Sequence, residues 1–502
     1  MNRLLLLKVA LVTAACLTLS WQNLAQNTAT HNPTWWAKYQ YLSQHAPSAD
    51  GASSSSLTVG SNIDVSNECG PQSETYITIN SQSSKSLAAG SNEIFRLPMR
   101  GYFSTDNGST WGALDVPLPP PLQGTHDTRF GSDPSLAFDS SGNLFYSYIV
   151  VYFGGGRGID GSEMAVARST DGGQSYPQLT LFNFQGGSNH FNDKPMITSD
   201  TNSGSPFRDG IYVAWDASSG GSAANGGIHV ARSSDAGASF TLTRVDNPSG
   251  PGRGIGAVPF VGPNGEVYAA WNDYGDNLIA FNRSFDGGVT WDEQRTISLK
   301  TAAVDVAIPS EIFRRALVYP ACDTDRSNGP HRGRLYCSWM DLTPDGVTDI
   351  FVSFSDDHGS TWTVPHAATD QFPTKLVDHF NQWLAVDPVT GDVNLSFYDT
   401  RNDTTGFRFM TDTYFTQSVD GGVTFLTPNV RVSSVISNEH DCNGLFPCPA
   451  IDYGNQQGDY EGLASLGGVS HPIWTDSRRQ LESSAGCRTN LLMEEVFTAT
   501  VK

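Results

Sequence analysis

Residues 284–291 read SFDGGVTW, and the same pattern, SxDxGx(S/T) followed by an aromatic residue, occurs six times in this chain of 502 residues. Successive copies of this repeat motif begin 65, 64, 51, 71 and 63 residues apart. Near-regular recurrence is typical of repeat folds, in which each repeat is one small structural unit. The copies are STDNGSTW (104–111), STDGGQSY (169–176), SSDAGASF (233–240), SFDGGVTW (284–291), SDDHGSTW (355–362) and SVDGGVTF (418–425).

The residue types of the repeat motif suit a tight turn. The Asp carboxylate can accept backbone N–H bonds across the turn, the Gly supplies a positive φ, and the aromatic residue anchors the hairpin. We therefore expect a structural role rather than a catalytic one for the six motif aspartates. They are Asp106, Asp171, Asp235, Asp286, Asp357 and Asp420.

A second pattern precedes the motifs and indicates an all-β chain. Aromatic-rich segments end in Asp, as in IYVAWD (211–216), VYAAWND (267–273), LYCSWMD (335–341) and NLSFYD (394–399). Their β-branched and aromatic residues predict strands. PIWTD (472–476) adds a unit after the last motif, so seven units are preferred and six are the alternative. The seventh lacks a fourth strand, which residues 57–66 could supply and so leave no open edge.

The repeat motif resembles the Asp box, or BNR repeat, of the sialidase family. That resemblance implies a β-propeller of four-stranded antiparallel blades, with the Asp-box turns between the third and fourth strands and far from the active site. The single propeller would span residues 57–502, preceded by a Ser-rich linker over residues 26–56.

The N-terminus predicts export. Residues 1–25 combine Arg3 and Lys8 with a short apolar run, as a signal peptide does, and the run is too short to cross a bilayer. The alternative is lipid anchoring at Cys16. We expect a secreted protein, extracellular or periplasmic, with no membrane insertion.

The net charge limits the possible binding partners of the protein, and the cysteine content predicts disulfides. The net charge is −21, or −23 without residues 1–25, which disfavours binding to nucleic acid or anionic membranes. Six cysteines remain after cleavage, and an even number in an exported chain predicts disulfides. The repeat layout favours Cys69–Cys487, Cys322–Cys337 and Cys442–Cys448. We expect a monomer.

Strand alternation places the loops before first strands and after second strands on the face opposite the motif turns. These loops carry acidic residues, which could bind a cation such as Ca²⁺, act as acid and base, or only cap loops. Metal binding stays undecided, and no cofactor is required. Candidate ligand-binding residues on that face are His190, Asp193, His379 and Trp383; Trp271 and Trp339 are more typical of blade packing.

The late units supply the candidate catalytic residues. GDYEGL (458–463), DTRND (399–403) and DSRR (476–479) hold the candidates Asp399, Arg401, Asp459, Tyr460, Glu461, Asp476 and Arg478. The resemblance implies a Tyr nucleophile partnered by Glu, an Asp acid/base and three arginines, so that Tyr460 would be the nucleophile and Arg401 and Arg478 two of the arginines. Neighbouring strand residues point to opposite faces, so Glu461 could not readily activate Tyr460. Each Asp–Arg pair could equally be a loop salt bridge.

These residues are compatible with two functions. The first is a glycoside hydrolase of sialidase-like type, possibly an exo-glycosidase. The second is a non-catalytic propeller that binds carbohydrate or protein, possibly with Ca²⁺. In both cases the expected ligand is a glycan or glycoprotein.

Overall fold

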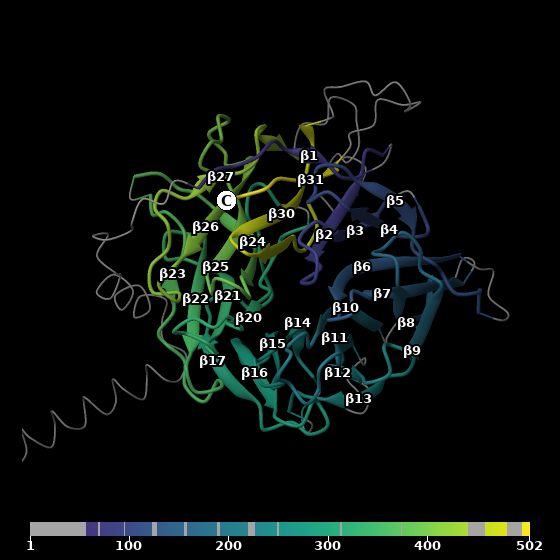
Figure 1. Cartoon of the computed structure of the whole chain (residues 1–502). Coiled ribbons are helices and arrows are strands. Elements are labelled where there is room, and N and C mark those ends of the chain that lie inside the picture. Colours follow the sequence, from purple (N-terminus) through teal and green to yellow (C-terminus); the bar gives the residue numbers. More distant parts are fainter. Residues whose placement is uncertain are drawn as a thin grey trace, which may run out of the picture.

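The computed structural model describes residues 57–68, 71–94, 96–122, 128–154, 158–187, 191–218, 226–247, 250, 252–311, 314–372, 374–439, 457–478 and 494–502. These residues form a seven-bladed β-propeller of four-stranded antiparallel blades and contain no α-helix (Figure 1). The predicted fold class and the preferred count of seven blades are confirmed. No helix in the described part of the chain is long and apolar enough to cross a membrane.

Each blade runs outward from the central channel, and the first strands of neighbouring blades contact one another around the ring. The first strands are β2 (Gln72–Ile79), β6 (Thr128–Phe138), β10 (Phe191–Ser199), β14 (Gly254–Val261), β20 (Ala321–Thr324), β24 (His379–Val386) and β29 (Gly462–Leu466). The second strands are β3 (Leu87–Glu93), β7 (Leu144–Gly154), β11 (Ile211–Ser218), β15 (Val267–Asp273), β21 (Leu335–Leu342), β25 (Val393–Asp399) and β30 (Val469–Asp476).

The outer half of each blade follows the same order. The third strands are β4 (Arg100–Ser104), β8 (Gly158–Ser169), β12 (Gly227–Ser233), β16 (Leu278–Ser284), β22 (Thr348–Ser355), β26 (Met410–Ser418) and β31 (Glu495–Thr498). The outermost are β5 (Gly112–Asp115), β9 (Gln178–Gly186), β13 (Thr241–Arg244), β17 (Arg295–Leu299), β23 (His366–Ala367), β27 (Val430–Arg431) and β1 (Ile63–Asp64). A small hairpin, β18 (Asp305–Val306) with β19 (Ala316–Leu317), precedes blade five, and β28 (Ser437–Asn438) adds to blade six.

The N-terminal strand closes the ring, as the sequence predicts. Strand β1 pairs antiparallel with β31, so that blade seven combines the two ends of the described chain. A bridge between Val59 and Val501 extends this pairing. The closure leaves no open seam between the first and last blades.

The repeat motif forms the turn between third and fourth strands. In the fourth copy, Ser284 Oγ donates to Asp286 Oδ1 (2.8 Å), and Gly288 N donates back to Ser284 Oγ (2.9 Å). Asp286 also accepts bonds from the backbone N (2.9 Å) and side-chain Oγ1 (2.6 Å) of Thr290. The corresponding Ser–Asp and Asp–Ser/Thr side-chain bonds recur in the other five copies.

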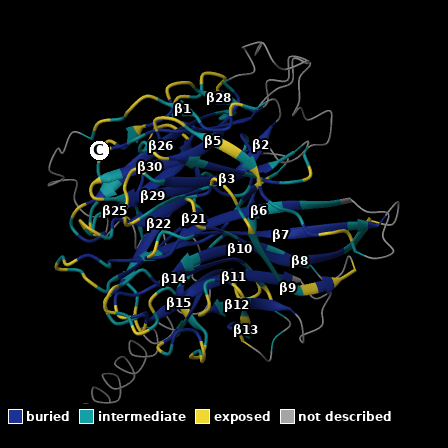
Figure 2. Ribbon diagram, turned by 45° about the vertical axis from the view of Figure 1, so that its right-hand side comes forward, coloured by how far each residue is buried: buried dark blue, intermediate teal, exposed yellow. Residues whose placement is uncertain are grey.

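The core lies between adjacent blades. Trp215, Trp271, Trp339 and Trp474 stand on second strands and are fully buried, as are most residues of the inner strands (Figure 2). The blade-packing role expected for Trp271 and Trp339 agrees with this burial. One predicted disulfide, Cys322–Cys337, joins β20 to β21. The predicted pairs Cys69–Cys487 and Cys442–Cys448 involve residues outside the described ones, as do His190, the signal peptide with Cys16, and the linker.

Candidate functional site

The first strands of five blades carry a β-bulge at one equivalent position. There the pairing with the second strand shifts, and one residue adopts a positive φ. These residues are Glu74 (53°), Asp133 (62°), Lys194 (48°), Gly256 (66°) and Asn381 (47°). Left-handed backbone is uncommon for residues other than Gly and persists where the surroundings enforce it, often at functional sites. The bulges therefore single out one end of the channel.

That end is the one opposite the repeat-motif turns, because the motif turns lie where first strands end and the bulges lie near where they begin. Several charged and aromatic side chains converge there from blades one, two, three and seven and from the segment before blade five. We call this group the bulge cluster. Its members are Glu74, Asp133, Asp193, Lys194, Asp216, Arg314, Tyr319, Asp459 and Tyr460.

Lys194 lies at the centre of the bulge cluster. Its Nζ is 3.5 Å from the ring centroid of Tyr319 and 3.6 Å from that of Tyr460, which places the ammonium between two aromatic faces. The residue is 3% exposed, and its Nζ has no hydrogen-bond acceptor among the described residues. Burial lowers the pKa of Lys194 to about 8, against the attraction of nearby carboxylates such as Asp459 and Glu74.

Two carboxyl groups face each other across the first two strands of blade three. Asp193 on β10 pairs in register with Asp216 on β11. Burial, and then the carboxylates of Asp133 and Asp216, raise the pKa of Asp193 well above its usual range. Burial also raises the pKa of Asp216 to about 7, although its Oδ1 accepts a bond from Gly256 N (3.1 Å). These groups can hold a proton near neutral pH, as a general acid must.

The side chain of Arg314, in the segment between β18 and β19, reaches across the bulge end of the channel. The Arg314 guanidinium donates to Asp459 in blade seven and lies 3.3 Å from Glu74 Oε1 in blade one. Burial, and then Asp459 and Asp133, raise the pKa of Glu74. Asp193 and Asp459 are the half-buried carboxylates of the bulge cluster, whereas Glu74, Asp133 and Asp216 are buried.

Gly256 leaves the room that Tyr319 fills. A Cβ on Gly256 would lie 2.1 Å from Tyr319 Cδ1, and the φ of 66° adds backbone strain for any other residue. We expect Gly256→Ala to displace Tyr319 from Lys194 and to destabilise the fold by roughly 2 kcal/mol. Urea unfolding of the variant checks this. Gly406→Ala is the control, because its φ is 78° but nothing lies within 4 Å of the added Cβ; an equal loss in both variants would contradict the crowding argument.

The structure separates the predicted pair Tyr460 and Glu461. The Tyr460 hydroxyl donates to the carbonyl of Pro134 (3.1 Å), and burial raises the pKa of Tyr460 well above its usual range. Glu461 is buried near Tyr398, between blades six and seven. The two side chains thus point away from each other, in agreement with the alternation argument. Of the candidate catalytic residues, the bulge cluster contains Asp459 and Tyr460.

Arg401 and Asp399 belong to a buried network between blades five and six. Arg401 Nε donates to Asp399 Oδ2 (2.7 Å), and its NH1 donates to Asp370 Oδ2 (2.6 Å). His379 lies between Asp349 (3.2 Å) and Asp399 (3.1 Å). These contacts give the groups partners within the protein.

Arg478 and Asp476 repeat the same arrangement in blade seven. Arg478 Nε donates to Asp476 Oδ1 (2.8 Å), and its guanidinium also bonds Asn62 Oδ1 (3.0 Å) beside the closing strand. The Arg478 guanidinium covers the Phe497 ring at 4.0 Å. The Asp–Arg spacing in both loops therefore makes a loop salt bridge, which was one of the two interpretations of the sequence.

Trp383 is buried rather than presented to solvent. It is 6% exposed and packs edge-on against Tyr76, with ring centroids 5.3 Å apart. Its ring centroid also lies 6.4 Å from that of Tyr460.

Within the described residues, no group of three or more His, Cys, Asp or Glu side chains is arranged to hold a metal ion.

The sequence reading did not single out Glu74, Lys194, Arg314 or Tyr319. One signal was present: the bulges align as SETY (73–76), SDPS (132–135), DKPM (193–196), IGAV (255–258) and FNQW (380–383). Comparing first strands in this register would have grouped three of the left-handed residues, Glu74, Asp133 and Lys194, at one channel end. Arg314 comes from a segment outside the blade pattern, so periodicity could not find it.

No protein-family model and no curated protein matches this chain. Among solved structures, its neighbours include sialidases and another β-propeller glycosidase. A leech intramolecular trans-sialidase is 14% identical, with a TM-score of 0.46 over 68% of this chain and 67% of that one. A Streptococcus pneumoniae sialidase is 10% identical, with a TM-score of 0.47 over 76% of this chain and 71% of that one. An α-L-arabinofuranosidase of Fusarium graminearum is 12% identical, with a TM-score of 0.45 over 72% of this chain and 98% of that one. Because these TM-scores are below 0.5, the proposals below rest on this chain's own residues.

Proposed function

We propose that this propeller is a secreted glycoside hydrolase whose chemistry takes place in the bulge cluster. The observation that carries the proposal is the carboxyl pair of Asp193 and Asp216, which face each other across β10 and β11 at the channel mouth. Their raised pKa values keep a proton available near neutral pH. Cleavage of a glycosidic bond requires such a protonated carboxyl to protonate the leaving oxygen.

The remaining groups complete the chemistry. A second carboxylate, Asp459, would act as base or nucleophile, and the bond that Arg314 donates to it would hold it in position. Lys194 supplies positive charge that limits repulsion among the surrounding carboxylates. In this proposal Tyr460 holds the Lys194 ammonium with its ring, because its hydroxyl is already bonded to Pro134.

The test is turnover of a panel of fluorogenic glycosides, with neutral and acidic sugars, by the mature chain and by Asp193→Asn. We expect the variant to lose at least about 100-fold in kcat/KM, the usual range for general acid catalysis. The wild-type rate should fall as pH rises through about 7, where Asp216 loses its proton.

Asp235→Asn is the matched control, because Asp235 lies in a repeat-motif turn on the opposite face; its activity should equal that of the wild type. No turnover of any glycoside, with or without added Ca²⁺, would overturn the proposal and leave the binding function. Turnover that survives in Asp193→Asn would move the chemistry away from the Asp193–Asp216 pair.

A further inference from the structure

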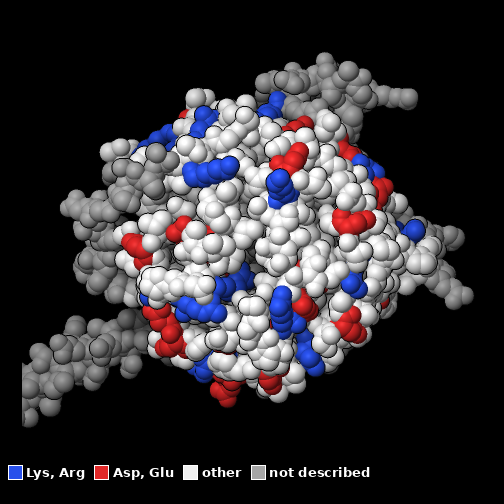
Figure 3. All heavy atoms as spheres, viewed as in Figure 1, with Lys and Arg blue, Asp and Glu red and all other residues white. Residues whose placement is uncertain are grey.

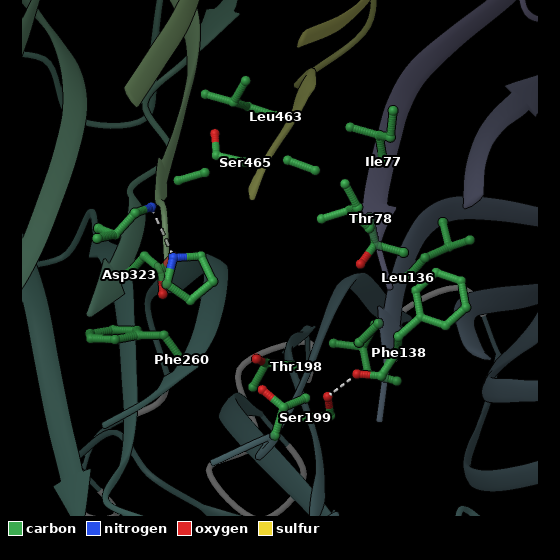
Figure 4. A pocket seen from close by; sticks show the side chains of 18 of the residues that line it. Ile77, Thr78, Leu136, Phe138, Thr198, Ser199, Phe260, Asp323, Leu463 and Ser465 are labelled. Carbon is green, nitrogen blue, oxygen red and sulfur yellow. Dashed lines mark hydrogen bonds between the residues drawn. The ribbon is translucent and has the colours of Figure 1, made fainter. Parts of the chain in front are cut away.

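A cavity of about 180 Å³ lies in the central channel and is lined by the first strands of all seven blades (Figure 4). Its walls continue to the end of β29 at Leu466 and to the turns that follow three other first strands, at Ser81, Thr201 and Pro388, so it opens on the face of the repeat-motif turns. The centre of the disc is hollowed in Figure 3, with Lys and Arg side chains beside the hollow. The bulge cluster is at the other end of the channel.

Two aromatic side chains close the inner end of the cavity. Tyr76 and Trp383 both line it and pack against each other at 5.3 Å. Trp383 in turn contacts Tyr460 of the bulge cluster, at 6.4 Å between ring centroids. The aromatic layer therefore separates the cavity from the proposed catalytic groups, and a molecule in the cavity would touch none of them.

Polar side chains stand on the cavity wall among apolar ones. Thr78, Thr198 and Asp323 come from blades one, three and five, and each is half-buried, as are the wall residues Tyr76 and Ile79. Figure 4 shows these three labelled residues around the cavity, with Phe260 and Phe138 in the wall. Arg326 also lines the cavity and lies 3.3 Å from Asp323, so the two charges neutralise each other.

We propose that this cavity binds one neutral pyranose ring, as a free sugar or the end of a glycan. Its volume slightly exceeds the roughly 150 Å³ of a cavity that admits benzene, so it accommodates one six-membered ring and not two. A sugar presents apolar C–H faces to the aromatic inner end and hydroxyl edges to Thr78, Thr198, Asp323 and Arg326. The paired charges leave no excess for an ionic sugar.

The experiment is saturation-transfer NMR and titration of the mature chain with glucose, galactose and mannose. We expect millimolar affinity for at least one of them, and a change in tryptophan fluorescence that is reduced in Trp383→Phe. The double variant Thr78→Val, Thr198→Val keeps the side-chain volumes and removes two hydroxyls, and it should bind at least about tenfold more weakly. Thr198→Phe, which fills the cavity, should abolish binding.

Asp193→Asn separates the two proposals, because it alters only the bulge cluster. It should bind the sugar as the wild type does even if it no longer turns over glycosides. No binding of any of the three sugars to the wild-type chain would overturn the pyranose proposal. So would unchanged binding in both cavity variants, or a loss of binding in Asp193→Asn alone, which would place the sugar at the bulge cluster.

Discussion

Replacing Lys194 with methionine is expected to lower glycoside turnover by at least about 100-fold while changing the free energy of unfolding by no more than roughly 1 kcal/mol. The charge is unfavourably buried, as its pKa of about 8 indicates, so removing it relieves one cost. The neighbouring carboxyl groups of Glu74 and Asp216, whose pKa values the Lys194 charge lowers, would then take up protons more readily. The measurements are kcat/KM across pH and urea unfolding of the same samples.

Lys300→Met is the matched control, because Lys300 is the other lysine that is buried among the described residues. Its Nζ donates to Asn277 Oδ1 (2.9 Å) and to the carbonyl of Ala302 (2.8 Å). We expect this variant to lose roughly 2 kcal/mol of stability through unsatisfied acceptors, with unchanged turnover per folded molecule. A Lys194→Met variant that unfolds readily but keeps its turnover would show that Lys194 is structural.

Replacing His379 with leucine should cost roughly 3–5 kcal/mol of unfolding free energy, the effect of removing one partner from a buried ionic network. His379 is 3% exposed and lies between the carboxylates of Asp349 and Asp399. Leucine would leave both with one cation fewer. Urea unfolding at neutral pH measures the loss. His229→Leu is the control: it stacks on Trp215 at 5.4 Å, and burial lowers its pKa, so it is neutral at pH 7 and should cost less than about 1.5 kcal/mol.

The His379 network also sets the sign of a pH dependence. Burial alone would lower the pKa of His379, but Asp399 and Asp349 raise it to about 10. An unfolded histidine titrates near ~6.5, so the stabilisation is complete below about pH 6.5 and is lost as pH rises toward 10. Tm of the wild-type chain should fall over that interval more steeply than Tm of His379→Leu. Parallel curves would contradict the ionic account.

The fold could be predicted from the sequence because the residues of the repeated turns can be recognised by their chemistry. Each repeat motif contains the Ser, Asp and Ser/Thr groups that bond one another in the turn, and the loss of a fourth strand after PIWTD (472–476) pointed to residues 57–66. The site was harder, since it depends on bulges at Glu74, Asp133 and Lys194. Glu and Lys are not typical of left-handed backbone, and the tyrosines that hold Lys194 are far from it in sequence.

The pairing of Val59 with Val501 also constrains the order in which the molecule can be assembled. Residues 57–66 have no strand to join until residues 494–502 have been made, so blade seven is completed only once both segments exist. Until then six blades can pack side by side, but the ring stays open and the channel has a gap in its wall. Functions that depend on a closed channel therefore require residues 57–66 and 494–502 together.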